Sequence, residues 1–148
     1  MADTLKVLVW GRQADLAWAA GFFDGEGCVR VHHSKGDSYR LALSVSQADE
    51  RPLLHLRNIL GGRINDKSPA RPNRRRQWQW AASTREAASA LRAMLPYLVL
   101  KNGEASLALM FQAMLRVEYG NRRALSGWET AERASVYEAL GEYHQLHA

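Results

Sequence analysis

The sequence reads WAAGFFDGEG over residues 18–27, and this stretch decides the fold. Apolar residues recur here with helical spacing and would lie on more than one side of a helix. They predict a helix over residues 13–24 that is buried on more than one side. The glycines that follow predict its end. Asp24 precedes Gly25, and Glu26 stands between Gly25 and Gly27, so the foot of the helix carries two carboxylates that are two residues apart.

Ala17 and Gly21 are four residues apart, so they share a helix face that has no bulky side chain. Such a face lets a second helix backbone approach closely. A carboxylate just past the end of a close-packed helix pair lies where a divalent metal ion can bridge it to phosphate. The spacing alone is equally compatible with Asp24 capping a turn and Glu26 being an ordinary exposed acid.

Two hairpins and further helices extend outward from this stretch. Alternation of apolar residues predicts strands around residues 29–33 and 40–46, and a second pair at 63–67 and 75–82. Leucine-rich and alanine-rich segments predict helices after each hairpin, and two more helices over about 102–117 and 129–145. The chain is therefore expected to form a single α+β domain over residues 1–148. Its core would be αββαββα, a four-stranded antiparallel sheet with helices on one face and polar residues on the other.

The charge is concentrated in one place. The formal net charge is +5, and residues 63–80 hold six basic residues and one acid, so this stretch carries the whole excess. A concentrated basic segment favours a polyanionic partner, with nucleic acid the first candidate. A solvated basic loop is the alternative.

Composition excludes several classes of protein. Apolar residues make up 47% of the 148 residues, enough for a core without disulfides, and the single cysteine, Cys28, excludes an internal disulfide framework. No apolar run approaches the ~20 residues that span a bilayer, and the N-terminal residues lack the basic flank of a signal peptide. We expect no membrane partner and a reducing compartment, cytoplasmic or organellar, rather than secretion.

Residues 19–27, AAGFFDGEG, resemble the LAGLIDADG motif of homing endonucleases. Gln47 follows the second predicted strand where that family has a polar residue, and LPYLVLK at 95–101 resembles the segment that delivers a catalytic lysine. The resemblance covers roughly residues 13–117. It implies a saddle-shaped sheet that faces DNA, with C-terminal helices added to the core.

The resemblance also implies a role for each site residue. Glu26 would bind a divalent metal ion, Mg²⁺, with the Gly25 carbonyl beside it, and Asp24 would be mainly structural. Gln47 and Lys101 would order water and stabilise charge at the scissile phosphate. The second acid of the motif is usually aspartate, and the longer glutamate here still supplies hard oxygen ligands.

One motif in the chain implies a homodimer, since two-strand cleavage needs two acidic sites. The motif helices would pack together through Ala17, Ala20 and Gly21. The resulting hypothesis is an endonuclease, associated with intron or intein mobility, that cuts a long near-palindromic duplex without a small-molecule cofactor. A non-catalytic DNA-binding regulator on the same scaffold and an intron maturase that binds RNA are the alternatives.

The outward residues of the predicted sheet are suited to base edges and phosphates, because arginine pairs well with guanine and glutamine with adenine. The candidates for DNA contacts are Arg30, His32, Ser34, Arg40, Ser44, Arg63, Lys67, Arg75, Gln77 and Gln79.

Overall fold

The computed structural model of the protein describes residues 2–33, 39–68, 71–114 and 127–147. Helices and strands alternate along the chain as an α+β fold with a four-stranded antiparallel sheet, which confirms the predicted class. The helical elements are α1 (Ala2–Glu26), α2 (Arg51–Leu60), α3 (Thr84–Met94), the short 3₁₀ turn η1 (Leu95–Tyr97), α4 (Asn102–Met114) and α5 (Gly127–His147). The strands are β1 (Gly27–His33), β2 (Tyr39–Gln47), β3 (Arg63–Ser68) and β4 (Gln77–Ser83).

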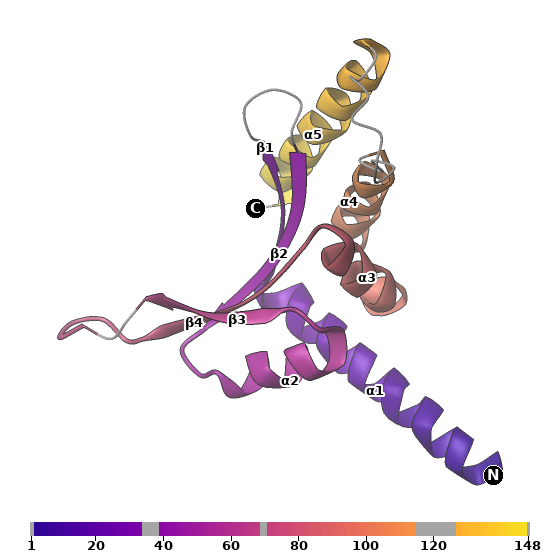
Figure 1. Cartoon of the computed structure of the whole chain (residues 1–148), viewed down its shortest axis with the longest axis vertical. Coiled ribbons are helices and arrows are strands. Elements are labelled where there is room, and N and C mark those ends of the chain that lie inside the picture. The colour runs from indigo at the N-terminus through magenta and orange to yellow at the C-terminus, as the bar shows by residue number, and fades with distance from the viewer. Residues whose placement is uncertain (1, 34–38, 69–70, 115–126, 148) are drawn as a thin grey trace, which may run out of the picture.

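The sheet consists of two hairpins joined side by side in the order β1-β2-β4-β3. The central strands pair with Val45 opposite Trp80 and Ser44 opposite Ala81. The β1–β2 hairpin and the β3–β4 hairpin point in different directions, so the sheet curves strongly (Figure 1). The helices lie on its outer side, and the opposite face is left uncovered by them.

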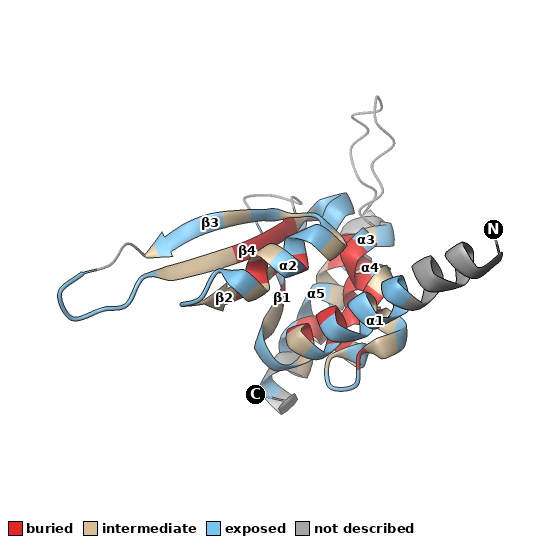
Figure 2. Ribbon diagram, turned by 90° about the horizontal axis from the view of Figure 1, so that it is seen from below, coloured by how far each residue is buried: buried red, intermediate tan, exposed pale blue. Residues whose placement is uncertain are grey.

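Alternate side chains of the strands build the core between the sheet and the helices. Val29, Leu43 and Trp80 point to the helical side and are fully or almost fully buried. They pack with Phe23 of α1 and with apolar residues of α2, α3 and α4 in one cluster. In Figure 2 the buried segments of α1, α3 and α4 gather against each other, while α1 extends beyond them towards the N-terminus.

The Gly61–Gly62 pair joins α2 to β3 in a conformation that other residues rarely adopt, with φ of 77° and 87°. A Cβ at Gly62 would lie 2.6 Å from Trp80 Nε1 and 2.8 Å from the Ala81 carbonyl oxygen. The buried Trp80 indole in turn donates to the Gly61 carbonyl at 2.8 Å. The two glycines therefore let the chain pass close over β4 and fix where β3 begins.

Several boundaries differ from the expected ones, and the first helix ends at Glu26 rather than at Asp24. The first helix begins at Ala2 rather than at residue 13, because helix geometry continues into a segment that has no amphipathic pattern to reveal it. Strand β4 begins at Gln77 rather than at Arg75, so Arg75 lies two residues before it. Helix α4 is described as far as Met114, and residues 115–117 of the predicted helix, like Ser34 and the turn around it, lie outside the described residues.

Candidate functional site

Residues 24–26, the foot of α1, meet the segment that follows η1. The Asp24 carboxylate accepts the backbone N–H of Val99 through Oδ2 at 2.7 Å and that of Lys101 through Oδ1 at 2.9 Å. Both oxygens of this acid are thus engaged by backbone donors. Asp24 fastens the 99–101 segment to the helix, in agreement with the structural role that the resemblance implies.

The Lys101 side chain returns to the same helix turn. Its Nζ donates to the Asp24 carbonyl oxygen at 2.6 Å. The last carbonyls of an α-helix have no partner within the helix, and its C-terminal end carries partial negative charge, so an ammonium group is favoured there. The lysine is held next to Gly25 and Glu26, where the resemblance expects it.

Glu26 and Gln47 lie at one end of the sheet. Glu26 is the exposed last residue of α1, and β1 starts at the next residue. The β1–β2 ladder opens with Gly27 opposite Val45, and Gln47 ends β2 two residues further on. The structure therefore brings the four predicted residues to the same region, although their catalytic roles stay predictions.

The donor set at the foot of α1 fits part of the shell of a divalent metal ion. The exposed Glu26 carboxylate makes no hydrogen bond or ion pair with any other residue that the structure describes. The same residues contain no cluster of three or more histidine, cysteine or acidic side chains suited to a metal ion. Mg²⁺ commonly takes one or two carboxylates and completes its shell with water and substrate phosphates. Glu26, with the Gly25 carbonyl, matches that partial protein shell.

One exposed face of α1 is formed by small residues. Ala17, Gly21 and Gly25 are exposed, and a Cβ at Gly21 or at Gly25 would meet no atom within 4 Å. Ala20, by contrast, is 0% exposed inside its own chain. This burial contradicts the assignment of Ala20 to the interface, because its position on the helix faces the sheet and not the open side.

The polar sheet face carries most of the predicted DNA contacts. Residues that are directly opposite in an antiparallel ladder share a face, as do alternate residues of one strand. The register places on the uncovered face Arg30, His32, Arg40, Ser44, Arg63, Gln77 and Gln79. Lys67 joins them, since its Nζ donates to Ser46 Oγ at 3.1 Å. Asn65, opposite Gln79, belongs to the same face and was missed by the sequence analysis, although it alternates with Arg63 and Lys67.

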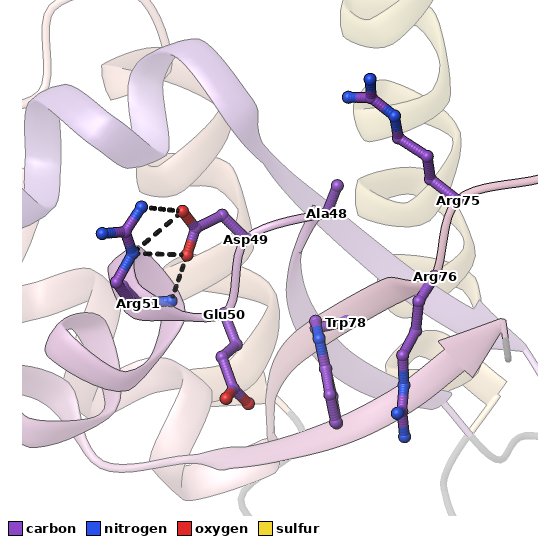
Figure 3. Close-up of a pocket in the computed structure, with 7 residues that line it drawn as sticks. All are labelled: Ala48, Asp49, Glu50, Arg51, Arg75, Arg76 and Trp78. Carbon is purple, nitrogen blue, oxygen red and sulfur yellow. Dashed lines mark hydrogen bonds and ion pairs between the residues drawn. The ribbon is translucent and has the colours of Figure 1, made fainter. Parts of the chain in front are cut away.

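An open hollow lies beside this face, between the turn at residues 48–51 and the start of β4 (Figure 3). Arg51 forms an ion pair and several hydrogen bonds with Asp49, and the pKa of this carboxyl is lowered to about 2 by those bonds. Arg51 is a cation close to the end of β2 that the sequence analysis did not single out, because one arginine at a helix start gives no distinctive signal. Across the hollow, Arg75 and Arg76 point in opposite directions.

The sequence profile of a known family matches residues 19–102, which is more than half of the chain, and the family is described as LAGLIDADG endonuclease. The chain belongs to the LAGLIDADG endonuclease family. The match includes the foot of α1, all four strands and the start of α4, so this membership makes the protein a DNA endonuclease by family. No match was found among curated proteins.

Solved structures of LAGLIDADG proteins share the fold. The homing endonuclease I-CvuI in complex with its target is 22% identical, with a TM-score of 0.63, over 89% of this chain and 98% of that one. The archaeal intron-encoded homing endonuclease I-Vdi141I in complex with DNA is 16% identical, with a TM-score of 0.71, over 88% and 84%. The LAGLIDADG meganuclease I-AabMI bound to uncleaved DNA is 21% identical, with a TM-score of 0.65, over 82% of this chain and 43% of that one.

Proposed function

We propose that the protein is a Mg²⁺-dependent homing endonuclease that acts as a homodimer and cuts both strands of a long near-palindromic DNA site. The observation that carries this proposal is the arrangement at the foot of α1. An unengaged carboxylate, Glu26, stands beside a lysine that is held by Asp24. The proposal includes a reducing compartment, cytoplasmic or organellar, which rests on the single cysteine, free in the structure.

Each residue at the foot of α1 has a separate role in the proposed phosphodiester hydrolysis. Glu26 and the Gly25 carbonyl would hold the metal ion, which lowers the pKa of bound water and offsets charge on the phosphate oxygens. Lys101 keeps donors beyond the one it gives to Asp24, and these can bind a non-bridging oxygen as negative charge develops there. Gln47, at the end of β2, can orient a water molecule through its amide.

The exposed face of α1 supports a dimer. A small-residue face that no described residue of its own chain covers is suited to close approach by the same face of a second copy. A two-fold axis along that contact puts both helix feet at the centre of the assembly. The chain covers 98% of I-CvuI but 43% of I-AabMI. Two copies of this chain would therefore be needed to match the length of I-AabMI.

The sheet supports binding to one half-site by each subunit. Strand β2 has nine residues and so spans about 30 Å, close to the ~34 Å of one duplex turn. The uncovered face of the sheet presents Arg40 of β2, with His32 of β1 and Gln79 of β4 on the neighbouring strands. Such a surface can follow the major groove, where base edges are distinguishable.

Cleavage of a randomised library of near-palindromic duplexes tests the proposal. We expect the full-length protein to cut a subset of the duplexes in Mg²⁺ and none in EDTA, and the Glu26→Gln variant to bind that subset without cutting it. Selective binding by the wild-type protein without cleavage would instead favour a DNA-binding regulator. Binding to structured RNA in preference to every duplex would favour a maturase.

A further inference from the structure

The Arg76 side chain is bound within the protein. Its Nη2 donates to Asp66 Oδ2 at 2.7 Å, and its guanidinium carbon lies 4.2 Å from the centre of the Trp78 ring. Figure 3 shows the Arg76 side chain running alongside that ring. The guanidinium is thus engaged by a carboxylate and by an aromatic face at once, two partners that suit its planar cation.

The clamp formed by Asp66, Arg76 and Trp78 sits where the β3–β4 ladder is irregular. Asp66 lies opposite Trp78, and the register shifts between Asp66 and Ser68. Arg76 immediately precedes β4, and within the described part of the chain no backbone hydrogen bond holds it or Arg75. The hydrogen bond and the ring contact that hold Arg76 at the entry to β4 are thus made by its side chain.

The two arginine side chains just before β4 point to opposite sides of the sheet. Asp66 and Trp78 share the helix-side face of the sheet, and Arg76 folds over them. Arg75 points the other way, towards the side of Gln77 and Gln79 (Figure 3). Because neighbouring residues of an extended chain alternate in direction, fixing Arg76 on one side fixes Arg75 on the other.

We propose that Arg76 is a positioning residue for DNA recognition, which acts through Asp66 and Trp78 and makes no phosphate contact of its own. This inference rests on the proposed function and refines it. It divides the six basic residues of segment 63–80 into those that can contact DNA and one, Arg76, that positions them.

The charge of Asp66 supports this division. It is the only acid in a basic segment, and an isolated carboxylate there would repel phosphate. Its ion pair with Arg76 leaves the two side chains with no net charge, at side-chain exposures of 31% and 50%. A carboxylate in this position does not favour contact with DNA phosphates. Its presence is explained if it orders the hairpin.

The test compares two arginines of the same hairpin. Arg76→Gln removes the clamp, and Arg74→Gln is the matched control at the hairpin tip, where Arg74 forms a backbone bridge with Arg71 but no side-chain bond with any described residue. The probes are a duplex recovered by the wild-type protein from the randomised library and a scrambled duplex of equal length. Affinities for both are measured over a salt series.

Arg76→Gln removes no phosphate contact but leaves Asp66 unpaired, so we expect it to weaken both affinities, to lower their ratio about tenfold, and to change the slope of log K against log salt by less than the control does. Arg74→Gln should keep the ratio and reduce the slope by about 0.9 per lost phosphate contact, hence about 1.8 in a dimer. A slope change for Arg76→Gln equal to that of the control would overturn the inference while leaving DNA recognition intact. If the wild-type protein selects no duplex at all, the proposed function itself fails.

Variants of Asp66 test the proposal in a second way, because the loss of its charge and the loss of the clamp predict different effects on DNA binding. By charge alone, Asp66→Asn should strengthen binding to every duplex. The clamp instead requires Asp66→Asn to lower the specificity ratio as Arg76→Gln does, and the double variant Asp66→Arg with Arg76→Asp to recover part of it. An unchanged ratio in Asp66→Asn, or no recovery in the double variant, would contradict the clamp.

Discussion

The Asp24 carboxylate holds the backbone of Lys101 at 2.9 Å, while the Lys101 ammonium returns to the Asp24 carbonyl oxygen at 2.6 Å. Each residue thus fixes the other through one backbone and one side-chain group. The acid orients the segment that carries the lysine, and the lysine satisfies a carbonyl at the end of the helix that carries the acid. This reciprocal contact sets the position of Lys101 relative to Glu26.

The two acids at the foot of α1 should respond differently to loss of charge. Asp24→Asn leaves an amide group facing a backbone donor, and hydrogen bonds to a charged acceptor contribute about 1.5–3 kcal/mol, so we expect a loss of about 1–2 kcal/mol in unfolding free energy. Glu26→Gln should leave stability unchanged, because that side chain has no partner among the described residues. Denaturant titration of both variants checks this. Equal destabilisation by the two changes would show that Glu26 has a structural bond as well.

Lys101→Met should slow the chemical step more than it weakens DNA binding, since the ammonium is proposed to act on charge that develops in the transition state. We expect a rate loss of about 10²–10³, measured in single-turnover cleavage at saturating Mg²⁺. Lys67→Met is the control, because Lys67 lies on the polar sheet face beside Ser46. It should weaken binding and spare the single-turnover rate. Parallel losses of rate and affinity in Lys101→Met would identify a simple phosphate anchor.

Gly21→Leu should abolish dimer formation without unfolding the chain. In a single chain the new side chain enters open space, but at a close helix crossing it would force two backbones apart, at a cost of about 1–3 kcal/mol per copy. Gly141→Leu on α5 is the control, since a Cβ there also meets nothing within 4 Å. Sedimentation velocity should show a monomer for the first variant alone. A dimer that persists in Gly21→Leu would place the interface elsewhere.

Gly27→Ala should destabilise the fold. A Cβ at this position would lie 2.3 Å from Cδ2 of the Phe23 ring, and that ring is fully buried, so it cannot move aside easily. Overpacking of this kind costs about 1–3 kcal/mol. Gly25→Ala, where a Cβ has open space, should have a much smaller effect. Thermal unfolding curves of the two variants decide the point, and matching midpoints would contradict the close approach of Gly27 to Phe23.

Thr84→Asn should stabilise the protein. Thr84 begins α3 with φ of 54°, a conformation that a β-branched residue adopts only under strain. Asparagine tolerates this region well, so we expect a gain of about 1 kcal/mol in unfolding free energy. Urea denaturation measures it. A loss of stability would mean that the threonine side chain contributes packing that outweighs the strain.

The sequence predicted the class of fold and the face of most strand residues because both follow from local periodicity. Alternation of Leu41, Leu43 and Val45 with polar residues is enough to separate the core side from the open side. The motif predicted the family, and the match of the family profile to residues 19–102 confirms that interpretation. The helix that carries the two acids ends at Glu26, two residues later than the glycines predicted.

Other features depend on contacts that local pattern does not contain. Ala20 sits next to Gly21 in the chain, and only the packing of α1 on the sheet decides that one is buried and the other open. Arg76 counts as one more positive charge in the sequence, whereas its bond to Asp66 comes from hairpin register. The bonds between Asp24 and Lys101 were likewise not predicted, since the fold alone brings these two distant residues together.

The Asp24–Lys101 contact also ties the chemistry to the completion of folding. The two residues are 77 positions apart, and both hairpins, α2 and α3 lie between them in the chain. Contacts of such separation form only after the intervening chain has been ordered, because closing a long loop costs entropy before it gains any bond. A partly folded chain can therefore present Glu26 but not the lysine beside it. Under the proposed function, DNA cleavage thus becomes possible only after the intervening sheet has formed.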